Sequence, residues 1–85
     1  MIPRTETPKS SNVAWFEHGA DGVLTIAFNN GGVYAHVAGS PEEQAEIDAQ
    51  ATRLLKNHEE GGSVGSFYHH YIKTNEDIPK AKRIK

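Results

Sequence analysis

The stretch Gly31-Gly32-Val33-Tyr34-Ala35-His36-Val37 decides the fold, because it opens with a chain reversal and continues as a β-strand. The apolar run 23–28 and the pair Asn29-Asn30 precede it. An Asn-Gly step between two apolar runs predicts a type I′ hairpin, in which both central residues take positive φ. We therefore expect strands over 23–28 and 33–37 to pair antiparallel.

Side chains alternate between the two faces of a strand, so each predicted strand has a face that we can assign. The core face of the first hairpin strand carries Leu24, Ile26 and Phe28, and on the second strand Tyr34 and His36 share a face. A further short strand is predicted over 13–17, joined to the hairpin by a glycine-rich turn at 18–22. The sequence leaves open which of its two large rings, Trp15 or Phe16, is buried.

Two helices follow the strands. Ser40 can cap the first, Pro41 suits its first turn, and Glu43 completes a capping box, so we expect a helix over 41–57. Ser63 can cap a second helix, whose apolar stripe comprises Val64, Phe67, Tyr68, Tyr71 and Ile72. The predicted fold is α+β: a three-stranded antiparallel meander followed by two helices packed on the sheet.

The length of 85 residues indicates one small domain. We predict a flexible arm over 1–9, a single domain over 10–74 and a basic C-terminal tail over 75–85. A domain of this size has a thin stability margin, which favours pairing with a second copy or a partner. Cysteine is absent and no apolar run is long enough to span a membrane, so we expect a cytoplasmic protein without membrane contact.

Charge is unevenly distributed along the chain, although the formal net charge is only −2. Acidic residues dominate the first predicted helix, beginning with Glu42, Glu43 and Glu46. The last residues are basic, with Lys80, Lys82, Arg83 and Lys85. A polarised molecule of this kind selects partners by charge.

Several short motifs together resemble a known family. They are Ser10-Ser11 before the first strand, the strand Gly32-x-Tyr34-x-His36, the Ser40-Pro41 helix start, and Gly65-Ser66-Phe67-Tyr68 followed by Ile72. Over about 10–73 this pattern resembles the KTSC domain, a module found at the C-terminus of some lysyl-tRNA synthetases and free-standing in bacteria and their phages. The family's mark on the third strand is Tyr-x-Tyr, and His36 stands here in place of the second tyrosine. The stretch between the helices also looks longer than usual. The resemblance implies a role in RNA or nucleic-acid binding.

Metal binding and catalysis find little support in the sequence. Adjacent His69 and His70 would point about 100° apart on a helix, and no pair of histidines has the spacing of a zinc site. The chain has no nucleophile elbow and no phosphate-binding glycine loop after a strand. We therefore expect neither a cofactor nor a metal, and no enzymatic activity.

The aromatic surface is the stronger candidate for a ligand site. Its predicted members, an aromatic and cationic set suited to stacking and phosphate contact, are Tyr34, His36, Tyr68, His69, Tyr71 and Lys73. Packing in the core is the competing explanation for the tyrosines. We expect a non-enzymatic module that binds RNA, single-stranded DNA or a nucleotide. The alternative is a protein-interaction or inhibitor module, of the kind a phage would encode, that uses the acidic helix 41–57 to engage a host protein.

Overall fold

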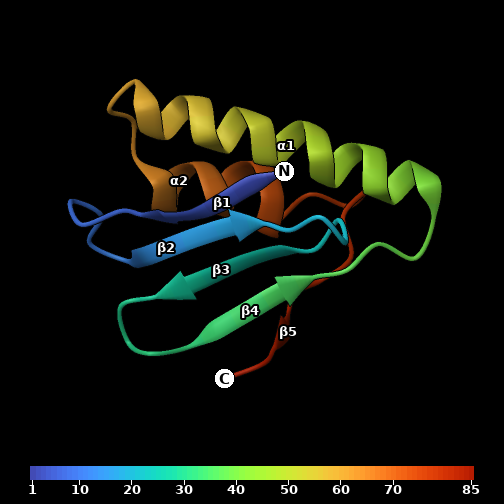
Figure 1. Cartoon of the computed structure of the whole chain (residues 1–85), viewed down its shortest axis with the longest axis horizontal. Coiled ribbons are helices and arrows are strands. Elements are labelled where there is room, and N and C mark those ends of the chain that lie inside the picture. Colours follow the sequence, from blue (N-terminus) through green and yellow to red (C-terminus); the bar gives the residue numbers. More distant parts are fainter.

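The computed structural model describes residues 1–85 and has two layers, a five-stranded antiparallel sheet with helices on one of its faces (Figure 1). The strands are β1 (Ile2–Glu6), β2 (Val13–His18), β3 (Leu24–Phe28), β4 (Val33–His36) and β5 (Lys82–Arg83), and they lie in this order across the sheet. The helices are α1 (Pro41–Glu59) and α2 (Val64–Tyr68), and α2 continues into a π-helical turn, η1 (His69–Lys73). The predicted α+β class is confirmed, whereas the predicted sheet of three strands is two strands short.

The predicted meander forms the centre of the sheet as β2, β3 and β4. Leu24 pairs with His18 on one side and His36 on the other, and Ile26 pairs with Phe16 and Tyr34. Leu24 and Ile26 are buried beneath the helices, as their alternation predicted. Phe16 is fully buried and Trp15 is partly exposed, which answers the question that the sequence left open.

The hairpin between β3 and β4 differs from the predicted type I′ turn. Only glycines in the chain have positive φ, so Asn30 does not take the conformation that a type I′ turn requires. The Gly31 N–H donates to the Phe28 carbonyl, the Phe28 N–H donates to the Gly32 carbonyl, and Gly31 has φ +94°. This is the pattern of a three-residue loop that ends in a left-handed glycine.

Both outer strands lie outside the predicted 10–74 domain, in the predicted arm and tail. Residues 2–6, in the predicted arm, form β1 beside β2, and Ile2 joins the core. Pro3 is compatible with this because β1 is an edge strand, where a missing N–H is tolerated. In the predicted tail, β5 pairs with β4, and Ile78 is buried before it. Arm and tail are therefore both packed against the 10–74 unit.

Helix α1 begins as its sequence predicts and ends at Glu59, two residues beyond the predicted 57. Ser40 accepts a hydrogen bond from the Glu43 N–H at 3.2 Å. The Glu43 carboxylate reaches back to the Gly39 N–H at 2.7 Å, one residue before the cap. Ile47, Ala51 and Leu54 form its buried stripe.

The second helical segment starts at the predicted cap but changes its pitch. Ser63 accepts a hydrogen bond from the Ser66 N–H, and α2 buries Val64, Phe67 and Tyr68. The π-helical turn η1 then takes more residues per turn than an α-helix. Ile72 is consequently buried while Tyr71 is 46% exposed, so the prediction that Tyr71 belongs to the buried stripe is wrong.

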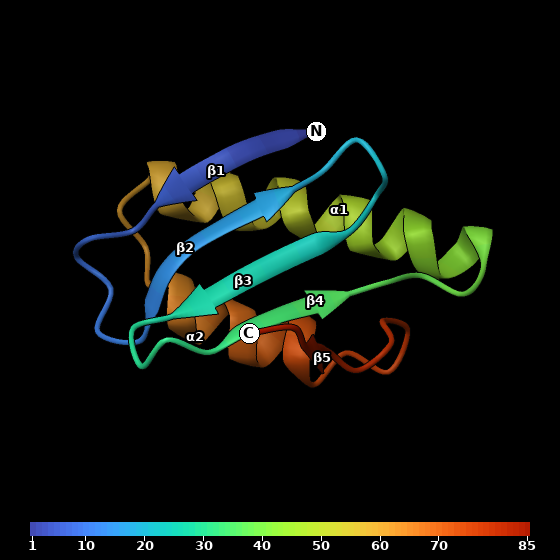
Figure 2. The same cartoon turned by 60° about the horizontal axis from the view of Figure 1, so that its bottom comes forward.

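The helices leave the other face of the sheet uncovered (Figure 2). The core lies between the sheet and the helices and consists of thirteen apolar side chains, Ile2, Val13, Phe16, Leu24, Ile26, Ile47, Ala51, Leu54, Val64, Phe67, Tyr68, Ile72 and Ile78. None of the helices is both long and apolar enough to cross a membrane.

Candidate functional site

A hollow of about 540 Å³ opens where β4, the α2–η1 segment and the chain leading into β5 come together. Its lining residues are Phe28, Asn30, Tyr34, His36, Tyr68, Lys73, Lys80 and Ala81. They come from five separate parts of the chain, so the hollow exists only when the sheet, the helical layer and the C-terminal segment are all in place. Its volume is within the range of small-ligand pockets, about 300–1,000 Å³.

His36 forms the floor of the hollow and is 1% exposed. Its Nδ1 lies 2.8 Å from the Pro79 carbonyl oxygen, and its Nε2 lies 2.8 Å from the Tyr68 hydroxyl. A carbonyl can only accept a hydrogen bond, so the proton of the neutral ring resides on Nδ1. Nε2 then accepts a hydrogen bond from Tyr68, and one imidazole joins β4 to α2 and to the segment before β5.

Burial keeps both members of this pair neutral. It lowers the pKa of His36 from its usual 6.5, although the hydrogen bond to the Pro79 carbonyl opposes the change. It also raises the pKa of Tyr68 to about 12, with a further contribution from neighbouring Tyr34. The floor is therefore an uncharged hydrogen-bonding surface near neutral pH.

The wall of the hollow is aromatic. The Phe28 ring meets Tyr34 edge-on at 5.6 Å between centroids and meets Tyr68 at 5.8 Å. Tyr34 is only partly buried, and the guanidinium carbon of Arg83 lies 6.0 Å from its ring centroid. Edge-on packing holds the rings in place, so the wall is a fixed surface against which a planar group can stack.

The rim of the hollow is positively charged. Lys73 of η1 and Lys80 of the following loop line it, both side chains are exposed, and no acidic residue is among its lining residues. Ammonium groups beside an aromatic wall suit a ligand with a planar ring and an anionic group.

The structure brings together most of the predicted site. Tyr34, His36, Tyr68 and Lys73 all line the hollow, joined by Lys80 from the predicted basic tail. Arg83 faces Tyr34 from β5, while Lys82 pairs beside Ala35 and so lies on the other face of the sheet. The Lys85 carbonyl accepts from Val33, which keeps the last residue beside β4.

Two predicted members lie outside the hollow. The Tyr71 ring packs on Phe67 at 4.7 Å, with the Arg53 guanidinium of α1 5.0 Å from its centroid. The exposed His69 has its ring near His70, 5.2 Å away. Residues adjacent along a helical segment face different sides of it, which places His69 away from the side of Tyr68.

Three lining residues were not among the predicted site residues. Phe28 was assigned to the core, Asn30 to the hairpin loop, and Ala81 carries no chemical signal. The alternation that groups Phe28 with Leu24 and Ile26 gave no indication that its ring would reach the edge of the helical layer.

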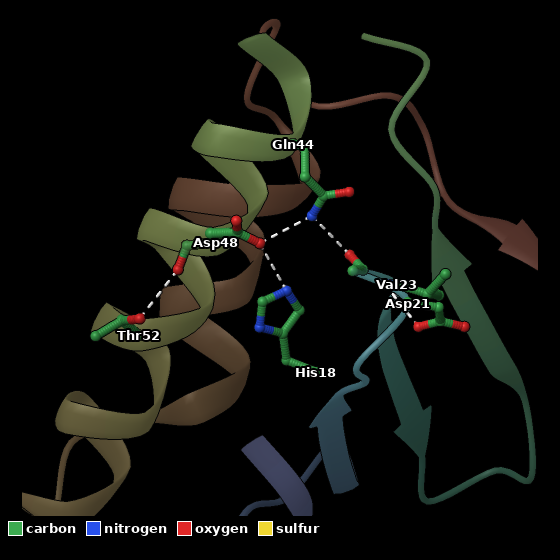
Figure 3. A network of polar contacts seen from close by, with 7 residues as sticks. His18, Asp21, Val23, Gln44, Asp48 and Thr52 are labelled. Atoms are coloured by element: carbon green, nitrogen blue, oxygen red, sulfur yellow. Dashed lines mark hydrogen bonds and ion pairs between the residues drawn. The ribbon is translucent and has the colours of Figure 1, made fainter. Parts of the chain in front are cut away.

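A second polar cluster lies between α1 and the turn that joins β2 to β3 (Figure 3). The His18 Nε2 is 2.8 Å from the Asp48 carboxylate, but the direction of the contact falls outside hydrogen-bond geometry. The Gln44 amide donates to both Asp48 at 2.8 Å and the Gly22 carbonyl at 2.9 Å. These contacts fasten α1 to the turn between β2 and β3. The sequence did not predict them, because His18 and Asp48 are far apart in the chain.

The acidic residues of the alternative hypothesis gather at the start of α1. Glu42, Glu43 and Glu46 border a shallow hollow with Glu76 and Asp77. Glu43 is used as a helix cap, as described above. Glu46 accepts hydrogen bonds from Asn75 at 2.8 Å and Gln50 at 3.2 Å, and the bond from Asn75 is the main cause of its lowered pKa.

No group of three or more histidine, aspartate or glutamate side chains converges closely enough to hold a metal ion. Comparison with known proteins adds no assignment, since no protein-family model and no curated protein matches the chain.

Proposed function

We propose that the chain is a non-enzymatic binding module for nucleic acid or a nucleotide, and that the ligand occupies the hollow between β4, η1 and β5. The observation that carries the proposal is the placement of Tyr34 and Phe28 beside Lys73 and Lys80, with no carboxylate in the lining. Single-stranded nucleic acids are bound by this combination of aromatic surface and cations.

Each part of the hollow has a role in this proposal. A base stacks against Tyr34, the ring that the protein leaves partly open. A phosphate is attracted by Lys73 and Lys80 at the rim. The His36–Tyr68 pair holds the floor in one arrangement, so the ligand meets a preformed surface.

The resemblance to the KTSC domain stays part of this proposal. Two of the segments that carry the resemblance, Tyr34-x-His36 and Phe67-Tyr68, meet through the hydrogen bond between His36 and Tyr68. Because His36 fills the position of the family's second tyrosine and is buried, we propose that this position serves the site by orienting Tyr68 and does not touch the ligand.

The test is the anisotropy of a fluorescent single-stranded oligonucleotide at low salt, followed by a salt titration. We expect binding that weakens steeply with salt, because phosphate contacts release counterions. Lys73→Glu and Lys80→Glu should each weaken binding at least tenfold and flatten the salt dependence. Lys56→Glu is the matched control, since Lys56 is exposed on α1 away from the hollow.

The stacking contact has its own test. Tyr34→Ala should cost about 1–3 kcal/mol of binding free energy, as loss of base stacking does elsewhere. Tyr71→Ala should leave the affinity unchanged, because Tyr71 is an exposed tyrosine outside the hollow. The absence of any anisotropy change at low salt, with mononucleotides also failing to compete or bind, overturns the proposal.

A second candidate function is a protein-interaction module that uses the acidic start of α1. The five carboxylates gathered there favour it. Since Glu43 and Glu46 already serve the fold, Glu42, Glu76 and Asp77 are the side chains that would meet a basic partner. A stoichiometric partner that is captured by the chain and lost on Glu42→Lys with Glu76→Lys would support this candidate.

A further inference from the structure

The face of the sheet turned away from the helices is uncovered (Figure 2). We call it the open sheet face. Strand alternation and register place on it the residues Arg4, Glu6, Trp15, Glu17, Thr25, Ala27, Val33, Ala35, Val37, Lys82 and Ile84.

One row of this face is apolar across four strands. Trp15 pairs with Ala27, Ala27 pairs with Val33, and the Ile84 N–H donates to the Val33 carbonyl at 2.8 Å. Val37 and Ile84 are 53% and 58% exposed, and they are two of the four large apolar side chains that the fold leaves most exposed. Apolar side chains gathered on one uncovered face of a sheet are a feature of interaction surfaces.

Charge on the open sheet face divides between its two edges. The β1–β2 half carries Glu6, Glu17 and Arg4, a net charge of −1, and the β5 edge carries Lys82, a charge of +1. In a dimer whose two-fold axis runs parallel to β3, the β1–β2 half of one copy faces the β4–β5 half of the other. Because a symmetric dimer contains this contact twice, Lys82 of each copy meets the acidic half of the other copy.

We propose that the open sheet face binds a second copy of this chain in a two-fold sheet-on-sheet dimer. The small side chains of Thr25, Ala27 and Ala35 lie at the centre and permit the sheets to approach to about 10 Å. Trp15 of each copy packs over Val33 and Ile84 of the other. Lys82 of each copy lies near the acidic residues of the opposite β1–β2 half.

The features of this face fit a protein copy better than a nucleic acid. The Arg4 guanidinium lies 4.1 Å from the Trp15 ring, so these two side chains would enter the dimer contact together. The two carboxylates of this face balance its two cations, so the face has no net positive charge to attract phosphates. The hollow lies on the helical side of the sheet, so the dimer leaves it open, and the inference is independent of the proposed function.

Sedimentation equilibrium from micromolar to millimolar concentration tests the dimer directly. We expect a reversible monomer–dimer transition, with the fluorescence of the single tryptophan shifting to the blue as the dimer forms. The double variant Val37→Lys with Ile84→Lys should raise the dissociation constant at least tenfold. Tyr71→Lys is the matched control, because Tyr71 is similarly exposed but outside this face. Circular dichroism and thermal unfolding establish that each variant folds.

A charge exchange tests the orientation. Glu17→Lys and Lys82→Glu should each weaken the dimer by about three- to tenfold, and an equimolar mixture of the two single variants should recover wild-type affinity. Glu59→Lys, an exposed change on α1, should have no effect. A monomer at every concentration overturns the proposal, as does a dimer unaffected by the Val37–Ile84 change. Protection of Trp15 by an added oligonucleotide on a chain that remains monomeric also overturns it, in favour of nucleic acid on this face.

Discussion

Two buried histidines, His18 and His36, lie in the same row of the sheet, one on each side of Leu24. His36 has neutral partners on both nitrogens, the Pro79 carbonyl and the Tyr68 hydroxyl. His18 faces the Asp48 carboxylate, whose side chain is 53% exposed. The two histidines occupy equivalent strand positions but have different partners, because α2 and the segment before β5 lie against His36 whereas α1 lies against His18.

The comparison also separates two kinds of hollow. The one beside His36 has a cationic rim, whereas the one beside His18 is bordered by the carboxylates of Asp21 and Asp48. The sheet thus presents a basic recess at its β4 side and an acidic recess at its β2 side. An anionic ligand would therefore meet cations in the first recess and carboxylates in the second.

Replacement of His36 should have the largest effect on stability. His36→Ala removes a fully buried ring and leaves the Tyr68 hydroxyl and the Pro79 carbonyl without partners, so we expect a loss of about 3 kcal/mol. Tyr68→Phe keeps the volume and removes one hydrogen bond, with an expected loss of about 1–2 kcal/mol. Urea unfolding measures both. Equal losses for the two variants would contradict the role assigned to the imidazole.

The pH dependence of stability sharpens the comparison further. Because burial lowers the pKa of His36, the unfolded chain takes up a proton first as pH falls below 6.5, and stability declines there. This contribution is fully present above 6.5. The pKa of Tyr68 is raised from 10.0 to about 12, so its contribution is present below pH 10 and is lost as pH rises through that interval.

Thermal unfolding at a series of pH values checks both effects. His36→Phe should reduce the loss of stability between pH 6.5 and the start of acid unfolding. Tyr68→Phe should reduce the loss of stability above pH 10. A decline of stability below pH 6.5 that is the same in His36→Phe and in the wild-type chain would contradict the role of His36.

The smallest effect should come from the contact between His18 and Asp48. A double-mutant cycle with His18→Ala and Asp48→Ala isolates their interaction from the packing that each variant loses. We expect a coupling of about 0.2–1 kcal/mol that shrinks with salt, because the carboxylate is half exposed. A coupling free energy above about 2 kcal/mol would show that the His18–Asp48 contact stabilises the fold more than the His36–Tyr68 hydrogen bond does.

Local signals in the sequence were sufficient for the centre of this fold. The alternation of Leu24 and Ile26 and the cap at Ser40 act within a few residues, and the structure confirms them. The outer strands were missed because β1 contains a proline and few apolar residues and β5 has two charged residues. Their pairing depends on the neighbouring strand, and their own composition gives no signal for it.

The sequence was sufficient to predict which types of residue belong to the candidate site, but it did not predict how they are placed in space. The aromatic residues and lysines named from the sequence include five that line the hollow, Tyr34, His36, Tyr68, Lys73 and Lys80. The separation of Tyr71 from Tyr68 depends on the π-helical turn, for which the sequence offers no local rule. The pairing of His18 with Asp48 likewise depends on tertiary packing.

The outer wall of the hollow depends on β5, the shortest strand of the sheet, which reaches β4 only after the whole helical layer has intervened in the chain. Closing the long loop between β4 and β5 costs conformational entropy. The two-residue pairing of β5 with β4 provides few contacts to offset that cost. In native-state hydrogen exchange, the Ile84 amide should therefore open before those of β2 and β3. A ligand that contacts Lys80 would slow that opening. Binding would then be measurable as slower hydrogen exchange of the amides of the last strand.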